Sequence, residues 1–290
     1  MPSLRDIRTR IAATKSTRQI TSAMKMVSAA KLRRATESAT SARPYQQRLT
    51  ATIQRVAKGS GESENPLLKP RPEVKKVVLI VLGSDRGLCA GFNNTLNRRV
   101  LDWLDAQKDQ GRSVALRTYG KKARDFMKAR GVAVAEARID VTNVKYAKEA
   151  TALANEVTAL FVAGEVDEVW VGFNQFKNTL VQIPTFSKVL PLQIDAAAAG
   201  APAEAGPDYR YEPAGPEILD ALLPLYLRTL LLGAFLETEA GEQASRMTAM
   251  DNATRNASDL ITSLTLLYNR GRQAAITKEL IEIVSGAEAL

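Results

Sequence analysis

The stretch SLRDIRTRIAATKSTRQITSAMKMVSAAKLRRATESATSAR, residues 3–43, contains neither glycine nor proline. It is rich in Ala, Arg, Lys and Met, which favour helices, and Ser3 followed by Asp6 is typical of a capping box. At 1.5 Å per residue, this stretch would form a helix roughly 60 Å long, which exceeds the diameter of a small domain. We expect Pro44 to bend or break the helix, with helical structure continuing to Lys58.

A second long helix is predicted at the other end of the chain. Residues 225–290 contain no proline, and the four glycines in this region are weak points rather than stops. The 225–285 stretch would reach about 90 Å if it were helical throughout. Two helices of such length are too long to pack as ordinary helices on a compact core. Their presence at opposite ends of one chain indicates that the two ends pair with each other.

Apolar residues recur at helical spacing in both terminal segments. In the first segment the stripe consists of two triplets, Leu4, Ile7, Ile11 and Ile20, Met24, Val27. The stripe shifts around the helix between the triplets, as at a stutter in a coiled coil. In the last segment a heptad rhythm runs through Met250, Thr254, Ala257, Ile261, Leu264 and Tyr268, and resumes in a shifted frame at Ile276, Leu280 and Ile283. Such narrow stripes predict a long antiparallel coiled coil of the two termini.

The charge distribution favours the same pairing. The chain has a net charge of +9, yet residues 1–58 hold 13 Lys and Arg against two acidic residues, and residues 208–290 hold seven against twelve. Oppositely charged ends attract each other. Two alternatives stay open at this point. The helices could be core helices of a bundle, or the basic segment could bind nucleic acid, although no aromatic residue that could stack on a base precedes Tyr45.

The middle of the chain alternates strand and helix patterns. Short β-branched runs predict strands at 77–83, 113–120, 166–174 and 180–192, and helical patterns lie at 92–109, 121–130 and 145–163. This alternation predicts a small α/β, Rossmann-like domain with a largely parallel sheet, with the Pro184 strand at an edge. The expected organisation is a coiled-coil helix at 1–58, a connector at 59–73, the α/β domain at 74–195, a connector at 196–212 and a coiled-coil helix at 213–290.

Composition excludes several kinds of active site. The chain has no histidine and one cysteine, so a Ser-His-Asp triad, a zinc site and an internal disulfide are not expected. No uninterrupted apolar stretch reaches 18 residues, so we expect no membrane span. The loop GSDRGLCAGFNN (83–94) follows a strand and precedes a helix, where phosphate loops lie, but its glycines fit neither nucleotide-binding pattern. A tight structural turn is the favoured interpretation, with Cys89 buried, Asp85 and Arg86 paired with each other or a partner, and a nucleotide-binding enzyme as the alternative.

Three segments together resemble one known family. LRDIRTRIAATKSTRQITSAMKMVSAAKLRRA (4–35), GSDRGLCAGFN (83–93) and EQASRMTAMDNATRNASDLITSLTLLYNRGRQAAITKELIEIVSGAEAL (242–290) are similar to the gamma subunit of F-type ATP synthase, of the bacterial type and close to mitochondrial members. The resemblance implies a central rotor stalk that couples proton translocation to ATP synthesis and hydrolysis. It implies no catalytic site and no cofactor in this chain.

The resemblance also implies a set of partners. One copy would stand inside a hexamer of alpha and beta subunits, and would contact the epsilon subunit and the membrane-embedded c-ring. The chain would be a peripheral protein at the cytoplasmic face of the bacterial inner membrane, with no membrane span of its own and no bound nucleic acid.

The resemblance assigns contacts residue by residue. It places one group near acidic loops of the beta subunits: Met24, Lys25, Lys31, Arg33 and Arg34. It places Arg272, Gln273 and Thr277 at an upper polar contact with a beta subunit, and Ile276, Leu280, Ile283 and Val284 in an apolar bearing. Tyr209, Tyr211 and Glu212 would face epsilon and the c-ring.

Overall fold

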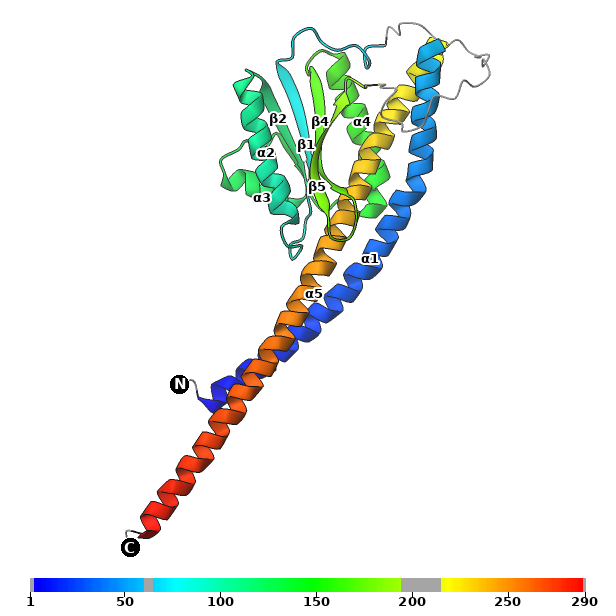
Figure 1. Ribbon diagram of the computed structural model, residues 1–290. Coiled ribbons are helices and arrows are strands. Elements are labelled where there is room, and N and C mark those ends of the chain that lie inside the picture. Colours follow the sequence, from blue (N-terminus) through cyan, green and yellow to red (C-terminus); the bar gives the residue numbers. More distant parts are fainter. Residues whose placement is uncertain (1–2, 60–64, 194–214, 289–290) are drawn as a thin grey trace. The chain divides into compact units, whose positions relative to one another are not determined.

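The computed structural model describes residues 3–59, 65–193 and 215–288 (Figure 1). The chain divides into two compact units. One comprises Ala30–Ser245, which we call the α/β unit, and the other combines Met1–Ala29 with Arg246–Leu290, which we call the helix-pair unit. The terminal helices α1 (Leu4–Gly59) and α5 (Gly215–Glu288) contribute residues to both units.

A five-stranded sheet forms the centre of the α/β unit. Its strands lie in the order β3-β2-β1-β4-β5, with bounds Lys76–Leu82 for β1, Ser113–Tyr119 for β2, Glu136–Arg138 for β3, Glu168–Phe176 for β4 and Gln182–Leu190 for β5. The first four of these strands in space pair in parallel, and β5 pairs with β4 antiparallel. The predicted α/β class with a largely parallel sheet is therefore confirmed.

Helices cover both faces of this sheet (Figure 1). Helices α2 (Phe92–Asp109) and α3 (Lys121–Ala129) lie on one face, and α4 (Tyr146–Val162), which follows a short 3-10 turn at Asn143–Lys145, lies on the other. Strand β1 is buried from Val77 to Leu82, as expected for a central parallel strand covered on both sides. Its alternate residues Leu79 and Val81 pack in the α2–α3 cluster, whereas Val78 and Ile80 pack in the α4 cluster.

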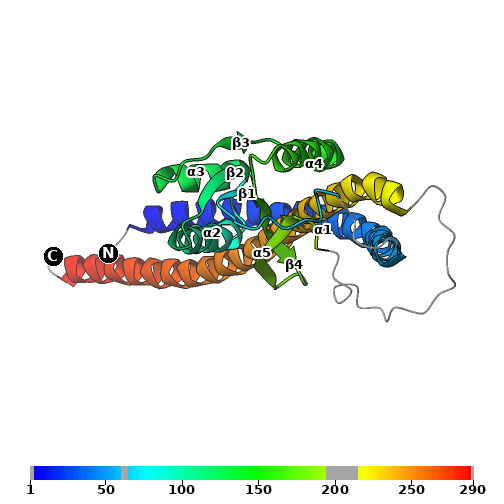
Figure 2. The same cartoon turned by 90° about the horizontal axis from the view of Figure 1, so that it is seen from above.

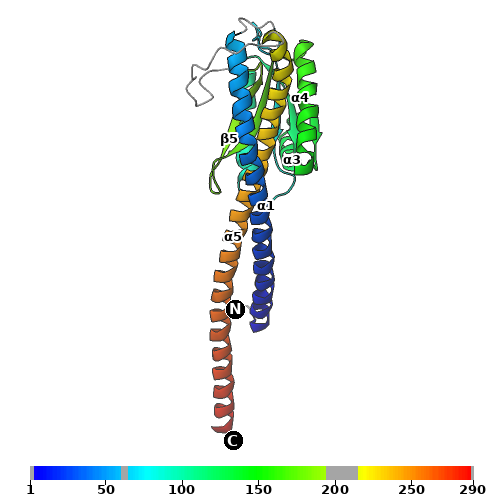
Figure 3. The ribbon, with the colours of Figure 1, turned by 90° about the vertical axis from the view of Figure 1, so that its right-hand side faces the viewer.

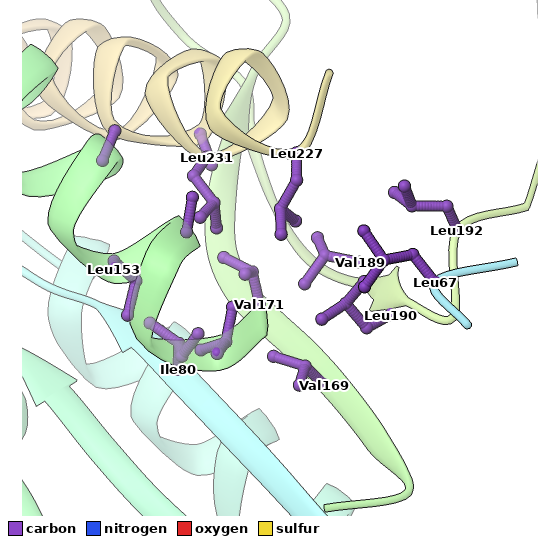
Figure 4. Close-up of a cluster of buried hydrophobic side chains, with 14 of the residues drawn as sticks. Leu67, Ile80, Leu153, Val169, Val171, Val189, Leu190, Leu192, Leu227 and Leu231 are labelled. Carbon is purple, nitrogen blue, oxygen red and sulfur yellow. The ribbon is translucent and has the colours of Figure 1, made fainter. Parts of the chain in front are cut away.

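The larger core cluster joins the sheet to the terminal helices. On α5 the buried residues follow one another at four-residue spacing: Leu219, Leu223, Leu227, Leu231 and Phe235. Figure 4 shows Leu227 and Leu231 directed from α5 towards the cluster that contains Val171 and Leu190. Residues Leu49, Ile53 and Val56 of α1 belong to the same cluster. Burial of each such side chain stabilises the fold by about 1.5–3 kcal/mol, so the packing holds both helices on the sheet.

Part of α5 is apolar enough to resemble a membrane-spanning helix. Within the described residues, one segment passes a test of length and composition, Pro216–Ser285, with a mean hydropathy of 1.6 over its best 18-residue window, of which 33% is buried. The leucines of α5 from Leu219 to Leu231 are packed in the core of the α/β unit. The apolar residues of this part of α5 therefore contribute to the core of the α/β unit.

Pro44 was expected to bend or break α1, and the helix is not broken there, so helical structure continues past Lys58. The helix runs from Leu4 to Gly59 with Pro44 inside it. A proline removes one backbone hydrogen bond and crowds the preceding turn, but Pro44 is exposed, whereas Leu49, Ile53 and Val56 beyond it are buried. Helix α5 likewise begins at Gly215 and passes through Pro224, so it is longer than the proline-free stretch that starts at Leu225.

The secondary structure between the terminal helices matches most of the predictions. Helix α2 has the predicted bounds, and β5 is an edge strand that contains Pro184, as expected. The three-residue strand β3 was not predicted. Its residues are Glu136, Ala137 and Arg138, which carry no β-branched or aromatic signal. They adopt strand structure because they pair with Arg117–Tyr119 of β2.

Candidate functional site

The helix-pair unit consists of α1 and α5 running antiparallel. Leu4 lies beside Gly271, because a Cβ added to Gly271 would stand 3.0 Å from Leu4 Cδ2. Further along, the Thr254 hydroxyl donates to Thr21 Oγ1 at 2.8 Å, and Lys25 Nζ lies 2.5 Å from Asp251 Oδ1. The two segments lie side by side in both Figure 2 and Figure 3. The predicted antiparallel pairing of the chain ends is therefore confirmed.

On α1 the pairing face differs from the predicted one. Ile7, Thr21 and Ser28 are buried, and Leu4, Ile11 and Thr14 are partly buried; these positions are three, four or seven residues apart and therefore share one face of the helix. Ile20 and Val27 are each 57% exposed, so the expected stutter and the stripe through those two residues are wrong. Small hydroxyl side chains fill the seam instead, because a threonine such as Thr21 can satisfy its hydroxyl on a backbone carbonyl, here that of Arg18 at 3.1 Å.

On α5 the predicted heptad is confirmed as far as Tyr268. Met250 and Ala257 are buried, and the other members, Thr254, Ile261, Leu264 and Tyr268, are partly buried. The seam then continues in the same frame at Gly271 and Ala275, which are also partly buried. The predicted shifted frame is wrong, since Ile276, Leu280 and Ile283 are 49%, 57% and 68% exposed.

One ion-pair cluster joins the two helices. Asp251 accepts from Lys25 of α1 and pairs with Arg255 one turn further along α5. The hydrogen bond from Lys25 is the main cause that lowers the pKa of the Asp251 carboxyl. The side chains of Lys25 and Asp251 are 44% and 21% exposed, so the cluster is reached by solvent. Lys25, which the family resemblance assigns to a partner subunit, thus has a partner within its own chain.

We expect Asp251→Asn to lower the thermal unfolding midpoint of the helix-pair unit by a small amount, because it removes the charge that Lys25 and Arg255 share. A lowered carboxyl pKa stabilises the folded state above the ordinary pKa, and this contribution disappears as the pH falls through the lowered value. The difference from the unmodified chain should therefore shrink in acid and in high salt. Circular dichroism melts of the full chain measure it, with exposed Asp259→Asn as the control, and equal shifts for both variants would contradict the prediction.

The other cations of the predicted beta-subunit contact on α1 are exposed. Lys31, Arg33 and Arg34 lie in the α/β unit and face solvent. Arg33 pairs with Glu37 one turn along the helix, 2.9 Å away. Burial and the neighbouring Glu242 raise the pKa of Glu239 on α5. Lys31 opposes this shift with a smaller lowering effect. Met24, in the helix-pair unit, is partly buried.

The end of α5 continues past the paired section. Leu4, the first residue of α1, lies beside Gly271, and α5 extends from there to Glu288 (Figure 3). The predicted contact residues Arg272, Gln273 and Thr277 are exposed there, as are Ile276, Leu280, Ile283 and Val284. Because helical positions three and four apart share a side, these four apolar residues form one stripe. Tyr209, Tyr211 and Glu212 lie outside the described residues.

The loop after β1 is closed by hydrogen bonds within the chain. Asp85 accepts from the backbone N–H of Lys121 at 2.9 Å and of Asp140 at 3.0 Å. Asn93 Oδ1 accepts from the backbone N–H and from the hydroxyl of Ser84, and buried Cys89 contacts the Asn93 amide. These contacts support the structural-turn interpretation. In the described ranges, no group of three or more His, Cys, Asp or Glu is placed to hold a metal ion.

Comparison with known proteins identifies the family. The family model described as ATP synthase matches residues 3–290. The chain is 46% identical to the ATP synthase gamma chain of Fuscovulum blasticum and 48% identical to that of Pelotomaculum thermopropionicum, with 100% of both chains covered in each case.

The chain belongs to the ATP synthase gamma-chain family. Solved structures agree with the fold of this family. A chain from the Euglena gracilis mitochondrial ATP synthase (OSCP/F1/c-ring) superposes with a TM-score of 0.64 at 20% identity, covering 99% of this chain and 94% of that one. A chain from the Tetrahymena thermophila mitochondrial ATP synthase (central stalk/c-ring) gives 0.58 at 24% identity, covering 81% and 99%.

Sequence reasoning missed two features of this gamma-chain family member. Thr21 and Ser28 were not assigned to the seam, although their spacing from Ile7 and Ile11 could have found them. Asp251 was not assigned to any site. Asp251 is an acidic residue in a segment expected to pair with the basic N-terminal helix, and this difference in charge could have predicted an ion pair between the helices.

Proposed function

We propose that this chain is the central rotor stalk of an F-type ATP synthase, which couples proton translocation through the membrane sector to the conformational cycle of the catalytic beta subunits. The observation that carries the proposal is full-length identity of 46–48% to gamma chains. The antiparallel pair of terminal helices supports it, since two helices wound together resist twisting. In this role the chain itself performs no chemistry and needs no cofactor.

The alternative of a nucleic-acid binder has less support. The full-length similarity of the chain is to gamma chains. In addition, no aromatic residue that could stack on a base precedes Tyr45. Weak retention of the chain on DNA at physiological salt is the expected result.

The proposed partners follow from the family. The chain would stand, as one copy, within a hexamer of alpha and beta subunits. Cations on α1 would face acidic loops of the beta subunits, where charge acts over several ångströms and is screened by salt. These residues are Lys25, Lys31, Arg33 and Arg34, with Met24 beside them, and Arg272, Gln273 and Thr277 would make the polar contact further along α5.

The exposed apolar stripe at the end of α5 would serve as the bearing of the stalk. Contacts made by Ile276, Leu280, Ile283 and Val284 are non-directional, so they would not hold the helix at one rotational position. The epsilon subunit and the c-ring would contact the region of Tyr209, Tyr211 and Glu212. The complex would hold the chain as a peripheral protein at the cytoplasmic face of a bacterial inner membrane.

The central experiment is reconstitution. The purified chain, mixed with alpha and beta subunits, should form a complex that hydrolyses ATP, and a bead attached to the α/β unit should rotate during hydrolysis. A chain that fails to co-assemble, or a complex whose bead never turns while ATP is hydrolysed, would overturn the proposal.

Leu280→Asp tests the bearing. Because Leu280 is 57% exposed, the variant should unfold like the unmodified chain when isolated, yet give a lower yield of assembled complex with alpha and beta subunits. Ser285→Asp adds the same charge on the opposite side of the helix and should assemble normally. Native-gel yields measure the difference, and equal yields would place the bearing elsewhere.

A further inference from the structure

The β4–β5 hairpin contacts α5 at three positions spaced four residues apart. These positions are Glu237, Gly241 and Ser245, which share one side of the helix. Their counterparts on the hairpin are Asn174, Phe176 and Gln182. We call this set of six residues the hairpin seat. All six belong to the α/β unit, and Ser245 is the last residue of α5 in that unit.

One of the contacts is a hydrogen bond with a fixed direction. The Ser245 hydroxyl donates to Gln182 Oε1 at 2.7 Å. The Gln182 amide nitrogen donates to the carbonyls of Asn178 and Thr179 in the hairpin turn, so the amide is oriented with its oxygen towards α5. Burial raises the pKa of the Glu237 carboxyl, against smaller lowering effects of Arg43 and of the backbone N–H of Phe176.

The third contact is a close approach of the helix backbone at a glycine, which a larger residue would make tighter than most packing contacts. A Cβ added to Gly241 would lie 3.0 Å from Phe92 Cε2 and 3.3 Å from Gln182 Cγ. Phe92, the first residue of α2, is buried, and its carbonyl accepts from the buried Asn174 amide at 3.0 Å. The Phe92 backbone is therefore fixed and its ring is buried, so a larger side chain at position 241 would have to displace that ring and the Gln182 side chain.

The seat differs in kind from the rest of the α5 interface. Between Leu219 and Phe235 the helix is held by apolar side chains, and apolar burial has no preferred direction. Hydrogen bonds weaken steeply when their angle changes, and the close approach at Gly241 opposes a rotation of the helix towards Phe92 and Gln182. The seat thus fixes the rotational setting of α5 at the residue where α5 leaves the α/β unit.

We propose that the hairpin seat is the joint through which torque passes between α5 and the sheet of the α/β unit. The inference rests on the proposed rotor function. Torque carried along residues 246–288 of α5 enters the α/β unit at the boundary of that unit, and Ser245 is the last α5 residue before this boundary. Glu237, Gly241 and Ser245 are positioning residues in this sense, since they act by holding the helix.

The test compares two glycines of the same helix. Gly233 meets Gln46 Oε1 at 3.6 Å, an ordinary contact with a flexible side chain, so Gly233→Val is the matched control for Gly241→Val. Both variants are assembled into the complete enzyme in vesicles, and ATP hydrolysis and ATP-driven proton pumping are measured. We expect Gly241→Val to retain hydrolysis and to lose pumping per ATP hydrolysed, whereas Gly233→Val retains both. Equal ratios in the two variants would overturn the proposal.

Smaller changes keep the test decisive if Gly241→Val does not assemble. Ser245→Ala removes one hydrogen bond and should lower the ratio of pumping to hydrolysis, and Ser245→Thr, which keeps the hydroxyl, should restore it. An unchanged ratio in Ser245→Ala would then overturn the proposal. The complex with the unmodified chain separates the two hypotheses: if it does not pump, the rotor function fails, and if it pumps and all variants pump equally, the seat alone fails.

Discussion

Gly120→Ala is expected to destabilise the α/β unit by at least about 3 kcal/mol. Gly120 has φ of 97° and ψ of 138°, a backbone conformation open almost only to glycine. A Cβ at this position would stand 2.6 Å from the carbonyl oxygen of Gly83 and 3.0 Å from the carbonyl carbon of Ser84. Both obstacles are backbone atoms, so no side-chain rotation can relieve the clash.

The clash would reach the ends of three strands. Gly83 donates its N–H to the Tyr119 carbonyl at 2.8 Å, and Gly120 donates to Arg138 at 2.8 Å. Moving Gly120 away from Gly83 would therefore loosen the carboxyl ends of β1, β2 and β3 together. Urea unfolding of the full chain should show the loss in the transition of the α/β unit.

Gly131→Ala is the matched control. Gly131 also has positive φ, at 71°, but among the described residues nothing lies within 4 Å of an added Cβ. Its cost should be the conformational one alone, about 1–2 kcal/mol. If the two substitutions cost the same, the close approach at Gly120 does not matter to stability.

Phe235→Ala is expected to cost about 3–5 kcal/mol, the usual range for removing a buried aromatic ring. Phe235 is 4% exposed. Its ring meets Tyr119 of β2 edge-on at 5.1 Å between centroids and stacks on Tyr146 of α4 at 5.2 Å. It thus joins α5 to the sheet and to α4 at one point, and alanine would leave a cavity that all three elements border.

Phe235→Leu separates volume from aromatic contact. Leucine fills most of the space, so its cost should be well below that of alanine, with the remainder reflecting the two ring contacts. Urea unfolding of both variants, followed by far-ultraviolet circular dichroism, gives the comparison. A cost for Phe235→Ala no larger than that for Phe235→Leu would show that the site collapses around the missing ring.

The sequence predicted those elements that carry strong local signals. Helix α2 and strand β1 are bounded by glycines and turn residues, and their patterns are uniform. The capping box at the start of α1 is also present, since Ser3 and Asp6 exchange hydrogen bonds between backbone N–H and side chain at 3.2 Å. In each case the interactions that fix the element lie within a few residues of one another.

The failures concern features that depend on distant residues. Ile20 and Val27 were assigned to the pairing seam because they are apolar. The face of α1 that pairs is set by its packing against α5, and Thr21 and Ser28 are the residues buried there. The hairpin seat was likewise invisible, because the need for glycine at position 241 arises from Phe92 and Gln182. Position 233 carries the same residue type without that constraint, so composition alone could not tell the two apart.

The contacts of the helix-pair unit join residues that are synthesised far apart in time. Thr21 and Thr254 are separated by 233 positions, and Lys25 and Asp251 by 226. On the ribosome, the first turns of α1 therefore emerge long before any residue of α5 exists to cover Ile7 or Thr21. Contacts of such long sequence separation form slowly. Until translation is nearly complete, the nascent chain therefore exposes the apolar face of α1 without the α5 segment that covers it. Chaperones would bind the chain during that interval.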